Sequence, residues 1–136
     1  AAGIGFEIIP GVSSASAAAA AAGIPLTRRL SARRVQFVTG HDIRGALPDG
    51  LHIAALADPD ATTVVFMPKR TFPELAAILI KAGLPSETPA LLAENVSHPD
   101  QRLTRSTVAG LAHALGASNS AVPAVILYGP LAGDDA

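Results

Sequence analysis

Short apolar runs that are typical of β-strands alternate with segments typical of α-helices along most of this sequence of 136 residues. Strands are predicted over residues 4–9, 34–39, 62–67, 90–94, 101–104 (at a sheet edge) and 123–128, with Val35 and Phe37 facing the core. Helices are predicted over residues 15–22, 51–56, 73–82 and 106–115, and a loose tail is expected after residue 129. This order predicts one α/β domain in which a mixed, mostly parallel sheet is flanked by helices.

The charge balance limits the classes of function. The formal net charge is -1, whereas a general nucleic-acid binder needs a basic excess, so no nucleic-acid partner is predicted. Charged residues make up only 15% of the chain, which suggests that another domain or subunit covers part of the surface. The sequence has no cysteine, which excludes disulfides and cysteine nucleophiles and is consistent with a reducing compartment.

Two long uncharged stretches, residues 8–27 and 106–133, are long enough for a membrane span. Small residues dominate both, and Pro10, Pro25 and Pro123 interrupt them, so neither is expected to cross a membrane. No signal peptide is visible at the amino terminus. A cytoplasmic location without a membrane partner is therefore the default prediction.

The common catalytic and metal-binding motifs are absent from the sequence. Its four histidines, at positions 41, 52, 98 and 113, do not have the spacing of metal ligands, and no metal site is predicted. Neither a Gly-x-Ser-x-Gly elbow nor a Walker or Rossmann glycine loop is present. Hydrolase and nucleotide-hydrolysis functions therefore have little support, and no catalytic residue is assigned.

Two patterns remain with an open interpretation. The segment from Ile9 to Ala15 is a tight turn and a serine-capped helix start, which either presents free amides to a ligand or is an ordinary connection. Eight of the ten basic residues are arginines, and five of these lie between Arg28 and Arg44. Such a cluster suits a polycarboxylate ligand, but it also suits a solvated face.

Six ordered blocks carry a more specific signal. They include Ile-Pro-Gly-Val-Ser-Ser-Ala with Ala-Gly-Ile-Pro-Leu-Thr-Arg-Arg, then Val-Thr-Gly-His, Val-Phe-Met and Glu-Asn-Val-Ser, and they span residues 9–29, 37–41, 65–67, 84–90, 94–102 and 123–126. These blocks resemble the motifs of the tetrapyrrole methylase family. The resemblance extends from residue 6 to residue 129, and the blocks at residues 23–27 and 38–41 favour the uroporphyrinogen-III branch.

The resemblance implies a two-domain homodimer that binds S-adenosylmethionine, as methyl donor, between its domains. Residues 1–136 resemble the C-terminal domain alone, and the N-terminal domain has no counterpart here. The implied activity is C-methylation of uroporphyrinogen III to precorrin-2 in sirohaem and cobalamin biosynthesis, with this chain inactive by itself. The alternatives are another precorrin methyltransferase, a ribosomal-RNA ribose or diphthamide-pathway methylase of the same fold, and a non-catalytic dimerisation or binding module.

The resemblance also implies site residues. Ser13, Ser14 and Met67 match positions that contact the methyl donor. Val96 stands where the family usually has a glycine that contacts the donor through its backbone. Arg29 matches a family arginine and, by its charge, is the candidate for binding a substrate propionate.

The predicted role of Arg29 can be tested by Arg29→Ala in the full-length protein. The guanidinium would pair with a substrate carboxylate, so its loss should weaken apparent substrate affinity more than donor affinity. Steady-state kinetics with each substrate varied in turn measures both. Unchanged apparent affinity for the tetrapyrrole would remove Arg29 from the site.

Overall fold

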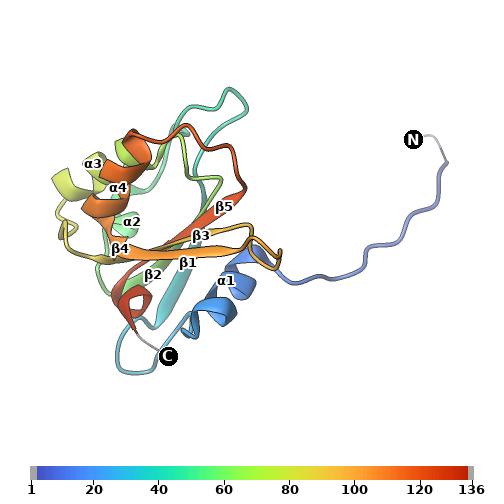
Figure 1. Cartoon of the computed structure of the whole chain (residues 1–136), viewed down its shortest axis with the longest axis horizontal. Coiled ribbons are helices and arrows are strands. Elements are labelled where there is room, and N and C mark those ends of the chain that lie inside the picture. The colour runs from blue at the N-terminus through green and yellow to red at the C-terminus, as the bar shows by residue number, and fades with distance from the viewer. Residues whose placement is uncertain (1–2, 135–136) are drawn as a thin grey trace.

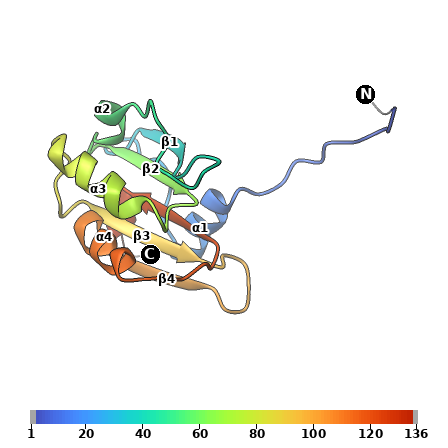
Figure 2. The same cartoon turned by 90° about the horizontal axis from the view of Figure 1, so that it is seen from above.

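The computed structural model describes residues 3–134, and within them five strands form one sheet in the order β1-β2-β5-β3-β4 (Figures 1 and 2). The strands are β1 (Arg34–Thr39), β2 (Ala61–Phe66), β3 (Pro89–Glu94), β4 (Arg102–Thr107) and β5 (Ala124–Tyr128). The helices are α1 (Ser14–Ala22), α2 (Ile53–Leu56), α3 (Phe72–Lys81), α4 (Val108–Gly116) and the 3-10 helix η1 (Pro130–Gly133). The predicted α/β class with a mixed sheet is confirmed.

The expectation of mostly parallel pairing is wrong. Among the described strands, only β1 and β2 pair in parallel, whereas the β2–β5, β5–β3 and β3–β4 pairs are antiparallel. Strands β1, β2 and β3 do run in one direction, as helical crossovers between them require. Strands β2 and β3 do not pair with each other, however, because β5 lies between them and runs in the opposite direction. On its other side, β3 pairs with β4, which is also antiparallel to it.

Helices cover both faces of the sheet, with α2, α3 and α4 on one side and α1 on the other (Figure 1). Successive residues of a strand point to opposite faces. In β5, Ile126 and Tyr128 therefore join the core beneath α3 and α4, while Val125 and Leu127 pack against the buried alanines of α1. The alanine side chains let α1 approach the sheet closely.

Two of the helices, α1 and α4, begin with a hydroxyl cap. Ser13 Oγ accepts a hydrogen bond from the Ala15 amide at 3.2 Å, and Thr107 Oγ1 accepts one from the Gly110 amide at 3.0 Å. Each cap satisfies an amide that has no partner inside its helix. Within residues 3–134, no helix is both long and apolar enough to cross a membrane.

Two predictions near the ends of the chain are wrong. Residues 4–9 are not a strand, because no other described strand pairs with them; they run away from the sheet with Ile4 and Phe6 exposed (Figure 1). Residues 130–134 are not loose, because η1 folds back and buries Leu131, while the last two residues of the predicted tail lie outside the described residues. Gly129, at φ 130°, permits this turn, since a Cβ there would lie 2.2 Å from the Ala61 carbonyl oxygen.

The strand prediction for residues 34–39 is confirmed, but Phe37 is not a core residue. Its side chain is 55% exposed, whereas Val35 packs against the α1-side core. β1 is an edge strand, and α1 contacts the central strand β5 instead of covering this edge. Phe37 stacks on Phe66 of the neighbouring strand, with ring centroids 5.9 Å apart.

Tyr128 makes the stability of the fold sensitive to alkaline pH. Its hydroxyl donates to the Leu56 carbonyl at 2.8 Å, and burial raises the pKa of Tyr128 to about 12. An unfolded tyrosine has a pKa of about 10, so stability is unaffected by this group below pH 10 and falls as pH rises toward 12. The linked loss is roughly 1 kcal/mol at pH 11.

Urea unfolding of the wild type and Tyr128→Phe at pH 9 and pH 11 measures this loss. The variant should be less stable at pH 9 by about 1 kcal/mol, because the hydrogen bond is missing. It should nevertheless lose less stability than the wild type between the two pH values. Equal losses would contradict the assignment to Tyr128.

Candidate functional site

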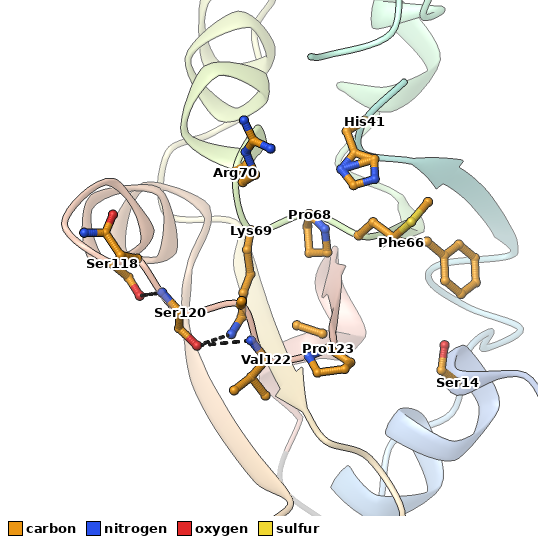
Figure 3. Close-up of a pocket in the computed structure, with 14 residues that line it drawn as sticks. Ser14, His41, Phe66, Pro68, Lys69, Arg70, Ser118, Ser120, Val122 and Pro123 are labelled. Carbon is orange, nitrogen blue, oxygen red and sulfur yellow. Dashed lines mark hydrogen bonds between the residues drawn. The ribbon is translucent and has the colours of Figure 1, made fainter. Parts of the chain in front are cut away.

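A groove lies where β1 and β2 end and β5 begins (Figure 3). It consists of a main pocket of about 600 Å³ and a smaller pocket of about 170 Å³, and Ser14, Pro123 and Ala124 line both. The walls of the main pocket come from the turn after β1, the loop after β2, the loop before β5 and the first residue of α1. The carboxyl ends of parallel strands are a common location for ligand sites in α/β sheets.

The two predicted serines have different positions. Ser13 is the helix cap, and its hydroxyl oxygen is engaged by the Ala15 amide. Ser14 is the first residue of α1 and lines both pockets, across the main pocket from Lys69 (Figure 3). Of the two hydroxyls, the one on Ser14 is therefore placed to contact a ligand.

Met67 lies in the main pocket, immediately after β2, with its side chain half exposed. Its backbone has a φ of 51°, a left-handed conformation that costs a non-glycine residue about 1–3 kcal/mol. Neighbouring hydrogen bonds hold this conformation: the Gly40 amide donates to the Phe66 carbonyl at 2.7 Å, and the buried Thr71 hydroxyl donates to the Gly40 carbonyl. Strain retained at a pocket wall is typical of a functional position.

Val96 lines the smaller pocket together with Asn95 and Ser14. The Asn95 amide donates to the Pro123 carbonyl at 3.0 Å, which joins the loop after β3 to the start of β5. The structure thus brings Ser14, Met67 and Val96 to one groove, although Met67 and Val96 line different parts of it.

Arg29 lies outside this groove. It is exposed in the turn before β1, whereas the groove is at the other end of that strand. Its neighbour Arg28 pairs with Asp134 at 2.6 Å, beyond the last residue of β5 and so at the far end of the sheet. The structure does not bring Arg29 together with the other predicted residues, and its substrate role stays a prediction.

Comparison with known proteins identifies the family. The family described as Tetrapyrrole (Corrin/Porphyrin) Methylases matches residues 1–112. The chain belongs to the tetrapyrrole methylase family. The resemblance read from the sequence blocks is thereby confirmed.

Curated relatives of this tetrapyrrole methylase are longer proteins. The siroheme synthase of Gluconacetobacter diazotrophicus is 41% identical over 95% of this chain and 27% of its own length. The S-adenosyl-L-methionine-dependent uroporphyrinogen III methyltransferase of Arabidopsis thaliana is 41% identical over 93% of this chain and 34% of its own length. The uroporphyrinogen-III C-methyltransferase of Paracoccus denitrificans is 35% identical over 96% of this chain and 45% of its own length. The chain therefore spans less than half of each of these relatives.

Solved structures agree with the fold. A uroporphyrin-III C-methyl transferase from Thermus thermophilus, complexed with S-adenyl homocysteine, matches 92% of this chain and 52% of its own with a TM-score of 0.74 and 29% identity. A cobalt precorrin-4 methyltransferase matches 90% of this chain and 51% of its own chain, with a TM-score of 0.76 and 31% identity. The chain covers about half of each.

Sequence reasoning missed the basic side chains of the groove. His41, Lys69 and Arg70 line the main pocket, and none of them was proposed as a site residue. The available signal was position, because Lys69 and Arg70 lie two and three residues after Met67 and His41 ends one of the family-like blocks. Arg70 forms no ion pair with any of the described residues. Within residues 3–134, no three His, Asp or Glu side chains lie close enough together to hold a metal ion.

Gly40→Ala should disturb the Met67 wall. A Cβ at Gly40 would lie 2.9 Å from the backbone oxygens of Phe66 and Met67, so the loop after β2 must move. We expect a loss of roughly 1–3 kcal/mol in the free energy of unfolding, measured by urea denaturation. Gly116→Ala is the matched control, because a Cβ there meets nothing within 4 Å. If Gly40→Ala were as stable as the wild type, the close approach of Gly40 to the loop after β2 would not be restrictive.

Proposed function

We propose that this chain supplies one wall of the donor site of an S-adenosylmethionine-dependent methyltransferase that converts uroporphyrinogen III to precorrin-2. The observation that carries the proposal is the groove shared by Ser14 and Met67 in a member of the tetrapyrrole methylase family. The names of the relatives support the tetrapyrrole substrate, and the S-adenyl homocysteine complex of the Thermus relative supports the donor. Ser14, Met67 and Val96 are the proposed donor-binding residues, and Ser13 caps the helix start that presents Ser14.

The groove is suited to alignment of reactants. The donor supplies an electrophilic methyl group, which the electron-rich pyrrole carbon attacks as the methyl–sulfur bond breaks. Met67, Val122 and Pro123 give the main pocket an apolar surface, and Ser14 supplies a hydroxyl at its rim. Holding two reactants in the correct geometry supplies much of a rate enhancement without a covalent intermediate.

We also propose that the active protein has a second domain, with this chain as the C-terminal one. The chain covers about half of the solved relatives, in agreement with such an arrangement. Between residue 4 and the start of α1, large apolar side chains at Ile4, Phe6, Ile8, Ile9 and Val12 are each more than three-quarters exposed. Packing against the other domain would cover them. A homodimer and a cytoplasmic location remain predictions from the resemblance and the sequence.

A later precorrin methyltransferase is the second candidate, because a cobalt precorrin-4 methyltransferase is among the similar structures. The two candidates differ in substrate and in the number and position of methyl groups added. The full-length protein should convert uroporphyrinogen III to a dimethylated product, identified by mass. Conversion of a precorrin with no turnover of uroporphyrinogen III would favour the second candidate.

Met67→Ala in the full-length protein tests the donor wall. The methionine side chain is half exposed in the groove, and its loss should raise the donor KM about tenfold through the missing apolar contact. Ile43→Ala is the control, because Ile43 is fully exposed in a loop and lines neither pocket. Equal donor KM values for Met67→Ala and wild type would contradict the proposed wall.

A further inference from the structure

The loop over residues 118–122, which precedes β5, forms one wall of the main pocket without regular secondary structure. Its side chains are exposed, and Val122 is its only large apolar residue. A short segment of small polar residues buries too little surface to offset the entropy of ordering it. The conformation of this wall therefore depends on hydrogen bonds.

Most hydrogen bonds of the loop are local. The Ser120 amide donates to Ser118 Oγ at 3.3 Å, and the Val122 amide donates to Ser120 Oγ at 3.4 Å (Figure 3). The Lys69 ammonium, which donates to Ser120 Oγ at 2.8 Å, comes from a segment distant in sequence. Among the described residues, it makes the only hydrogen bond from residues 118–122 to a partner outside residues 115–122.

Lys69 is itself fixed in place. Its Nζ lies 2.5 Å from Glu94 Oε1, at the last residue of β3, and the two side chains are only 12% and 15% exposed. Solvent and salt screen a pair with so little exposure much less than a surface pair. The other ion pairs within residues 3–134 each include a side chain that is at least half exposed.

We propose that Lys69 is a positioning residue that joins the Met67 wall of the groove to the loop wall. It follows Met67 by two residues, and its ammonium has three donors, two of which are used on Glu94 and Ser120. The distance between the walls is therefore set before a ligand binds. The inference rests on the proposed function, because it assigns this preorganisation to the donor site.

The first test measures loop order without any ligand. The chain has no cysteine, so Asn119→Cys in a background free of other cysteines provides one site for a nitroxide label. The electron paramagnetic resonance spectrum should show a restricted label in the wild type and a more mobile one in Lys69→Met. Lys69→Arg should restore much of the restriction. The control is Lys81→Met, which changes the other lysine of the chain, exposed on the last turn of α3.

The second test measures the consequence for binding in the full-length protein. The Kd for S-adenosylhomocysteine, measured by calorimetry, should rise roughly five- to tenfold in Lys69→Met, because the ligand must then order the loop. The donor KM should rise more than kcat falls, and Lys81→Met should match the wild type. Ser120→Ala removes the Lys69 contact together with the local bond from the Val122 amide but keeps the Lys69–Glu94 pair, so it should reproduce the mobile label and the weaker binding with little change in Tm.

The outcomes separate the two proposals. If the wild type does not bind S-adenosylhomocysteine, the proposed function fails, whatever the label shows. If the wild type binds it, and Lys69→Met and Ser120→Ala both have the Kd and the label mobility of the wild type, the positioning role of Lys69 is overturned. Should Lys69→Met fail to fold, Ser120→Ala alone decides the question.

Discussion

The backbone contact between Gly40 and residues 66–68 is the constraint on which the groove depends. A Cβ at position 40 would lie within 3.0 Å of three backbone atoms in that segment, so the ends of β1 and β2 meet without a side chain between them. The Gly40 amide and the Thr71 hydroxyl then fix the turn in which Met67 adopts its left-handed conformation. The strain at Met67 is tolerated because the surrounding bonds leave the turn no alternative.

The direction of β5 supplies the opposite side of the groove. Because β5 is antiparallel to β2, its first residues lie beside the last residues of β2. The loop that carries Ser120 is thereby brought to Met67, and Pro123 is brought to Ser14 and Val96. A sheet with β5 parallel to β2 would place this loop at the other end of the molecule.

Local patterns in the sequence predicted most elements, because caps, turn glycines and apolar periodicity act over a few residues. Family-like blocks led to Ser14 and Met67, which share the main pocket. Strand order was not predictable in this way, since it depends on contacts between residues far apart in the chain. The same limit explains why Lys69, which meets Glu94 and Ser120 only in the fold, was missed. Arg29 was predicted to bind substrate from its charge and its position in a family-like block. Neither property specifies at which end of the sheet a residue lies.

The exposed segment before α1 affects how this chain would behave in solution by itself. It combines alternating apolar side chains at Ile4, Phe6 and Ile8 with a backbone that pairs with no other described strand. An exposed, apolar segment of this kind, with unpaired backbone, is a template for edge-to-edge pairing with a neighbouring molecule. Molecules of the isolated chain would therefore be prone to self-association through this segment, even though the rest of the fold is well packed.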